Sequence, residues 1–167
     1  MPLRYGKNGP NTTSNMPSPT PASRFLRGAS ALMGLVFLFA VVVQYNDPDA
    51  LAWMVLYAAA AVACGLAAAG RLPARGAVQA LVAGVALVWA GALVVAEGQL
   101  ASPTRLFGAW EMADDAIEKS REVGGLVIVT GWMSVLTGAA FRQRRAASAE
   151  ERDREGRERV ADETDVN

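Results

Sequence analysis

Four long apolar stretches, separated by short polar segments, dominate the pattern of this chain. They cover residues 25–45, 50–70, 76–96 and 124–141. An α-helix rises about 1.5 Å per residue, so about 20 residues cross a hydrocarbon core about 30 Å thick. Lipid leaves backbone polar groups without partners, and such stretches therefore cross a bilayer as helices. The pattern predicts an all-α membrane protein, a four-transmembrane-helix bundle.

The segments outside these stretches divide the chain into three parts. Residues 1–24 are rich in Pro, Asn, Ser and Thr, and this composition predicts a disordered N-terminal tail because it buries too little apolar surface to offset the entropy of ordering. Residues 142–167 mix both charge signs and predict a charged, solvated C-terminal tail. We therefore expect the four helices to form one membrane domain over residues 25–141. The first stretch is longer than the roughly 7–15 apolar residues of a signal peptide, so an uncut helix is expected.

The distribution of Lys and Arg predicts the orientation of the helices. The segments before the first stretch, between the second and third, and after the fourth, counted together with Arg27 at the start of the first stretch, hold 13 basic and 8 acidic residues. The other two connections hold 3 basic and 8 acidic residues. Basic residues concentrate in the cytoplasmic segments of membrane proteins. We therefore expect a multi-pass protein of the cell membrane with both termini in the cytoplasm.

The connection over residues 97–123 is the longest one between the stretches. Ser102 and Pro103 form a typical helix start. Apolar residues then recur at spacings of four, three and four residues, at Leu106, Trp110, Ala113 and Ile117. This spacing predicts an amphipathic extracytoplasmic helix between the third and fourth spans, lying on the membrane surface.

Acidic residues share one face of this expected helix: Glu111, Asp114, Asp115, Glu118 and Glu122. Like charges three or four residues apart repel each other by a few tenths of a kcal/mol, roughly. The group is either an ordinary solvated face or a set of oxygen ligands for a divalent cation or a cationic ligand.

The composition excludes several kinds of site. The chain contains no His and a single Cys, Cys64. Structural disulfides, zinc sites built from Cys or His, and catalysis with a His base are therefore excluded. The sequence identifies no cofactor. The expected partners are the lipid bilayer and a lipid head group or cation, and no nucleic-acid partner is expected.

A short polar turn follows the first stretch. Gln44 and Asn46 carry side-chain amides that can bind carbonyl groups left free at a helix end. Either Asp47 or Asp49 can cap the next helix, where a negative charge also favours the positive end of the helix dipole. The turn is therefore either a tightly capped hairpin or, because two carboxylates and two amides lie within six residues, a binding site.

Aromatic residues gather on the outer side of the expected topology. Trp53 and Tyr57 lie near the start of the second helix, and Trp89 and Trp132 lie in the outer halves of the third and fourth. An aromatic belt normally occupies both faces of a membrane. The placement indicates either a one-sided belt with packing roles, or an aromatic-walled outer cavity that favours a cationic head group through cation–π contact.

Two blocks of the sequence resemble the transmembrane protein 220 family. The first block consists of Gln44, Tyr45, Asn46, Asp47, Pro48 and Asp49, followed by Trp53 and Tyr57. The second block consists of Glu118, Arg121, Glu122, Gly125, Leu126, Val127, Ile128, Thr130 and Trp132. The resemblance implies an integral membrane protein with four helices and implies no established activity.

Together these features favour a non-enzymatic membrane protein whose acidic and aromatic outer site binds a lipid head group, a cation or a partner protein. The alternative is a membrane-embedded hydrolase or transferase acting on lipid, in which carboxylates provide acid–base chemistry or hold a metal ion that activates water. A small transporter is disfavoured because no ionisable residue and no Pro lies in the middle of a span. The candidate binding residues are Gln44, Asn46, Asp47, Asp49, Trp53, Tyr57, Glu118, Arg121 and Glu122.

We also expect the two blocks to meet. Residues 44–49 and 118–122 lie on the same side of the membrane in this topology, and the first and fourth helices of a bundle can be neighbours. The expected contact is an ion pair between Arg121 and Asp47.

Overall fold

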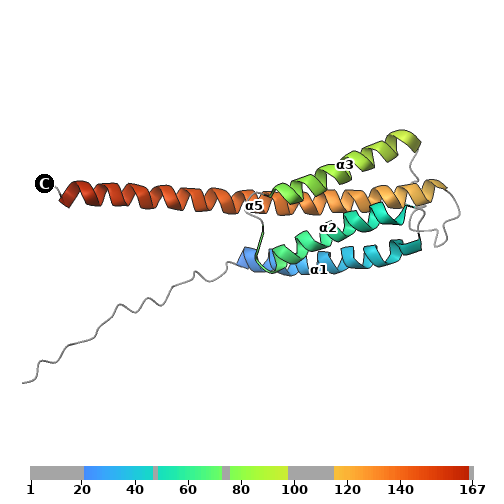
Figure 1. Ribbon diagram of the computed structural model, residues 1–167, viewed down its shortest axis with the longest axis horizontal. Helices are drawn as coiled ribbons and strands as arrows, with labels where there is room; N and C mark the ends of the chain where they lie inside the picture. The colour runs from blue at the N-terminus through green and yellow to red at the C-terminus, as the bar shows by residue number, and fades with distance from the viewer. Residues whose placement is uncertain (1–20, 47–48, 73–75, 98–114, 166–167) are drawn as a thin grey trace, which may run out of the picture.

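The computed structural model describes residues 21–46, 49–72, 76–97 and 115–165, and all regular structure in these ranges is helical (Figure 1). The elements are α1 (Pro21–Val43), a 3₁₀ turn η1 (Gln44–Asn46), α2 (Ala50–Ala68), α3 (Ala77–Glu97) and α5 (Asp115–Asp165). Four helices are long and apolar enough to cross a membrane, the last of them through part of α5. The predicted all-α, four-span membrane fold is therefore confirmed.

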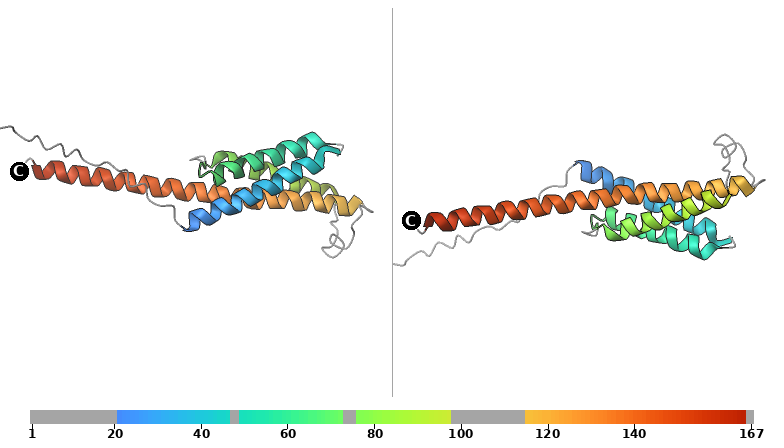
Figure 2. Two further views of the ribbon diagram at one scale, coloured as in Figure 1. Left: turned by 90° about the horizontal axis from the view of Figure 1, so that it is seen from below. Right: turned by 90° about the horizontal axis from the view of Figure 1, so that it is seen from above.

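The helices form two antiparallel pairs. The helix α1 packs along α2, and α3 packs along α5 (Figures 1 and 2). The pairs are joined through α2, which makes smaller contacts with α3 and α5. We call the end of the bundle that carries η1 and the start of α5 the turn end, and the opposite end, where α1 begins and α5 leaves the bundle, the tail end. Because α2 contacts each of the other three helices, it determines how the two pairs are placed relative to each other.

Glycine shapes the connection at the tail end. Gly70 and Gly76 have φ angles of +73° and +60°, a left-handed conformation that residues with a Cβ atom rarely adopt. The Arg71 backbone N–H donates a 2.8 Å hydrogen bond to the Leu66 carbonyl and satisfies one of the carbonyl groups left free at the end of α2. The Arg27 guanidinium donates a 2.8 Å hydrogen bond to the Ala68 carbonyl, and this bond ties the start of α1 to the end of α2.

Small residues let the helices approach closely. A Cβ atom on Gly34 of α1 would lie 3.3 Å from the Cys64 Cβ of α2, and one on Gly76 would lie 3.3 Å from the Ala140 Cβ of α5. Such small-residue contacts are typical of helix packing in membranes. Large apolar side chains on the outside, such as Leu35 and Val88, remain exposed, as expected for surfaces that face lipid rather than water.

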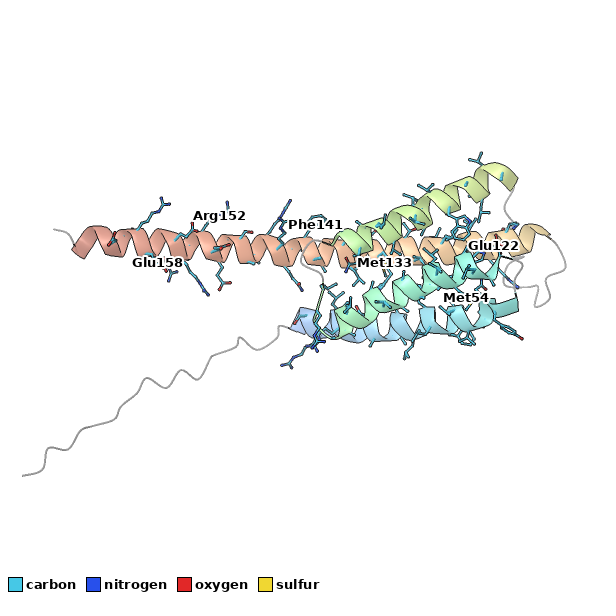
Figure 3. The ribbon with its side chains drawn as sticks, in the orientation of Figure 1. Met54, Glu122, Met133, Phe141, Arg152 and Glu158 are labelled. Atoms are coloured by element: carbon cyan, nitrogen blue, oxygen red, sulfur yellow. The ribbon has the colours of Figure 1, made fainter. Side chains whose placement is uncertain are left out.

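The helix α5 is longer than the sequence predicted. It runs without a break from Asp115 through the fourth apolar stretch to Asp165. Residues 98–114, which hold most of the expected amphipathic helix, lie outside the described residues; the remainder of that segment is part of α5 rather than a separate helix. Beyond Phe141, labelled in Figure 3 where the helix leaves the bundle, the expected tail is also helical.

Local interactions explain why α5 continues past residue 141 and why α1 begins before residue 25. No Pro interrupts residues 142–165, and i,i+4 ion pairs join Arg157 to Asp153 at 2.8 Å and Arg154 to Glu150 at 3.9 Å. Pairs with this spacing stabilise a helix without tertiary support. At the other terminus α1 begins at Pro21, within the segment expected to be disordered. Proline is favoured at the first helical position because that position needs no backbone donor.

Candidate functional site

Four aromatic side chains from three helices stack against one another in the turn-end half of the bundle. The ring centres of Trp53 and Trp89 lie 4.4 Å apart, those of Trp53 and Tyr57 lie 6.0 Å apart, and those of Phe37 and Tyr57 lie 6.3 Å apart. Trp53 and Tyr57 are four residues apart and therefore share one face of α2. Only 1% of the Trp53 surface is exposed. We call these four residues the aromatic cluster; it links α1, α2 and α3.

The helix α5 meets the aromatic cluster at Tyr57. The Tyr57 hydroxyl lies against Gly125, where an added Cβ atom would overlap it. One turn earlier on α5, the Glu122 carboxylate lies close enough to act electrostatically on the Tyr57 hydroxyl. Glu122 and Gly125 are three residues apart and share a helix face. A glycine thus makes room for the tyrosine, and the tyrosine lies beside a carboxylate.

Glu122 also forms an ion pair with Lys119. The Lys119 Nζ lies 3.3 Å from both carboxylate oxygens, which is longer than the roughly 2.7–2.9 Å of a strong hydrogen bond between ammonium and carboxylate. The side chains are 32% and 18% exposed. Partly exposed pairs with long contacts contribute little stability, about 0–1 kcal/mol. Figure 3 labels Glu122 near the turn end of α5.

The remaining candidate residues lie in different places. Gln44 is half-buried in η1, which contacts α1 and α2. Asp49 occupies the N-cap position of α2, but its side chain makes no capping hydrogen bond; of the two aspartates expected to cap this helix, the other, Asp47, is not among the described residues. Its backbone carbonyl accepts a 3.1 Å hydrogen bond from the Ala52 N–H instead. Arg121 is exposed on α5.

Three candidate positions are described only in part or not at all. Asp47 lies outside the described residues. Asn46 ends η1 and Glu118 lies in the first turns of α5, but their side chains lie outside what the structure describes. The expected ion pair between Arg121 and Asp47 therefore stays a prediction.

The expected direct approach of the first helix to the fourth is not seen among the described residues. Neither α1 nor η1 comes close to α5 along the backbone, because α1 packs on α2 and α5 packs on α3. The two halves of the site are connected through α2 instead. Tyr57, from the first family block, lies against Gly125, from the second, one turn along α5 from Glu122.

A shallow groove lies along the first turns of α2 at the turn end. It has a volume of about 510 Å³ and is lined by Asp49, Ala50, Leu51, Ala52 and Val55. Leu51 and Val55 provide an exposed apolar wall, and Asp49 provides a carboxylate. An apolar wall with a charged edge suits an amphiphile better than a water-soluble ligand.

The described residues contain no group of three or more His, Cys, Asp or Glu side chains that could hold a metal ion. The hydroxyl groups of Ser134 and Thr137 donate 2.8 Å hydrogen bonds to the carbonyls of Thr130 and Met133, four residues earlier in α5. These hydroxyls therefore stabilise their own helix. The described residues at the turn end thus carry carboxylate, ammonium and aromatic groups.

The family model described as "Transmembrane family 220, helix" matches residues 36–138, a range that contains the aromatic cluster, Glu122 and every candidate residue predicted from the sequence. No solved structure matches the chain.

Proposed function

The chain belongs to transmembrane family 220, and we propose that it is a non-enzymatic membrane protein that binds a lipid with a primary ammonium head group at the turn end. The observation that carries this proposal is the loose ion pair between Lys119 and Glu122 beside Tyr57. In that pair the Glu122 carboxylate already accepts a primary ammonium group. A lipid head group of the same chemistry replaces Lys119 without leaving the carboxylate unpaired.

The surroundings of Glu122 favour this exchange. Tyr57 is buried and its hydroxyl lies against Gly125, one turn from the carboxylate, so water is partly excluded on that side and the attraction between opposite charges is stronger there than in bulk water. Both Lys119 and Glu122 are partly exposed, so neither is enclosed before a ligand arrives. The head group would lie at the membrane interface, where its acyl chains stay in the bilayer and their burial requires no further protein surface.

Two substitutions at this pair should change binding in opposite directions. Replacing Glu122 with Gln removes the negative charge and should weaken binding of dioleoyl phosphatidylethanolamine about fivefold, the equivalent of about 1 kcal/mol. Replacing Lys119 with Met removes the internal competitor and should strengthen binding by up to about fivefold for the same reason. Lipid titration of the purified full chain in detergent, followed by thermal unfolding, measures both values.

Glu158→Gln on the exposed part of α5, far from the bundle in Figure 3, is the matched control and should leave binding unchanged. Binding of phosphatidylglycerol, which lacks the ammonium group, should not be weakened by Glu122→Gln. If Lys119→Met and Glu122→Gln change binding in the same direction, or if Glu122→Gln weakens phosphatidylglycerol binding equally, the ammonium assignment is wrong. Binding of an inorganic cation or of a protein at Glu122 in place of lipid would also show that the ammonium-lipid assignment is wrong.

The orientation of the chain forms part of this proposal. The basic residues favour both termini in the cytoplasm of a cell-membrane protein, which puts the turn end outside. In a Cys64→Ala background, a membrane-impermeant thiol reagent added to intact cells should label a cysteine at position 115 and not one at position 150. Labelling at position 150 in intact cells, with none at 115, would reverse the orientation.

A further inference from the structure

A second groove lies between α2 and α3 in the tail-end half of the bundle. It has a volume of about 330 Å³, and its lining residues are Ala58, Ala59, Val62, Ala63, Leu66, Val78 and Gln79. Ligand pockets begin at about 300 Å³. The stack of Trp53 on Trp89 joins the two helices at the turn end, whereas alanine side chains leave space between them nearer the tail end. The walls carry no charge, so the groove suits an apolar chain.

Gln79 gives this groove a polar feature. Its side chain has 0% exposure, and neither its amide nitrogen nor its amide oxygen has a hydrogen-bond partner. A buried polar group without a partner costs about 1–3 kcal/mol. Gln79 is the third residue of the span Ala77–Ala96 and therefore lies near the edge of the hydrocarbon core. A phospholipid places its ester carbonyls at this depth, and an amide N–H can donate to them.

Arg71 supplies a positive charge just beyond the groove. Its backbone N–H is bonded to the carbonyl of Leu66, a groove-lining residue. Its side chain is exposed, and it makes no ion pair with the described carboxylates. A guanidinium group is well suited to phosphate because its planar donors match two phosphate oxygens. The tail-end half of the bundle thus carries an apolar groove, the Gln79 amide among the groove's lining residues, and the Arg71 guanidinium group beyond the end of α2.

We propose that the groove between α2 and α3 binds a glycerophospholipid with an anionic head group. One acyl chain lies along the alanine residues of α2, an ester carbonyl accepts a hydrogen bond from the Gln79 amide, and the phosphate pairs with Arg71. Gln79 lines the groove and its amide is buried without a partner, so in this proposal the side chain turns toward the ester when lipid binds. This site lies at the opposite end of the bundle from Glu122 and does not depend on the function proposed above.

Gln79→Leu separates this proposal from a purely structural role. Without lipid, the variant should unfold at a higher Tm because it removes an amide that lacks a partner. With dioleoyl phosphatidylglycerol, its Kd should weaken roughly two- to tenfold, the range expected for one lost hydrogen bond. Ser30→Ala is the control, because the Ser30 hydroxyl is also buried without a partner but does not line the groove. It should raise the Tm and leave the Kd unchanged.

Two further variants test the other contacts. Arg71→Gln should weaken binding of phosphatidylglycerol about fivefold, which corresponds to about 1 kcal/mol for one basic residue at a membrane surface. Arg152→Gln, on the exposed part of α5, should have no effect. Ala59→Phe should fill the groove and abolish specific lipid binding, whereas Ala92→Phe, on an exposed face of α3 outside the groove, should not.

Native mass spectrometry of the full chain, titrated with phosphatidylglycerol or phosphatidylcholine, gives each Kd. The expected result is tighter binding of phosphatidylglycerol, with the losses given above. Equal binding of the two lipids, or unchanged Kd values in both Gln79→Leu and Ala59→Phe, would overturn the proposal. Because none of these substitutions touches Glu122, their failure leaves the turn-end site unaffected.

Discussion

Replacing Trp53 with Ala should lower the free energy of unfolding by about 3–5 kcal/mol, the usual cost of deleting a large buried aromatic side chain. Trp53 is 1% exposed and stacks on both Trp89 and Tyr57. Its loss removes the aromatic bridge between α2 and α3 and leaves a cavity between the two helix pairs. Equilibrium unfolding of the purified chain in mixed micelles with increasing dodecyl sulfate measures the change.

Phe39→Ala is the control for Trp53→Ala. Phe39 is an aromatic residue on α1, but 68% of its surface is exposed, so its removal leaves no internal cavity. The expected change is within about 0.5 kcal/mol, as for surface substitutions in general. Equal losses in the two variants would mean that the aromatic cluster does not hold the bundle together.

Replacing Gly125 with Ala should destabilise the protein by about 1–3 kcal/mol, the typical cost of overpacking. The added methyl group would overlap the Tyr57 hydroxyl. Tyr57→Phe removes that hydroxyl, and the next nearest atom, the ring carbon that carried it, lies 3.6 Å from the new methyl group, an ordinary contact distance. The double variant should therefore recover most of the stability that Gly125→Ala loses.

Gly124→Ala provides a matched control in the same turn of α5. Nothing lies within 4 Å of a Cβ atom at Gly124, so alanine should be tolerated there or should stabilise the helix by about 0.5–1 kcal/mol. Thermal unfolding of the four variants, with the double variant analysed as a double-mutant cycle, provides the measurement. Simple addition of the Gly125→Ala and Tyr57→Phe effects would show that the two residues do not meet.

The number and type of the helices were predictable because the length and apolar character of each stretch determine whether it can cross a bilayer. The pairing of the helices was not predictable in the same way. The helix α2 consists almost entirely of apolar residues, many of them Ala, so no polar face marks the side that points outward. Its position between the two helix pairs follows from close packing of small side chains, which leaves no periodic signal in the sequence.

Part of the candidate site was also predictable. Trp53, Tyr57 and Glu122 were expected at one side of the membrane; the structure stacks Trp53 on Tyr57 and places Tyr57 against Gly125, one turn from Glu122, and their role as a binding site stays a prediction. Phe37 was missed because it lies in a stretch of similar apolar residues, where nothing distinguishes the buried side chain from those that face lipid. The expected neighbourhood of the first and fourth helices was not observed because α2 takes that place.

The identity of the lipid retained by the full chain tests the central claim most directly. Native mass spectrometry after gentle extraction should detect a lipid with a primary ammonium head group on the unmodified chain. The same lipid should be largely lost from Glu122→Gln and retained by Glu158→Gln. Absence of any ammonium lipid from the unmodified chain, or equal retention of that lipid by Glu122→Gln, would contradict the assignment of Glu122 and its aromatic neighbours as a head-group site.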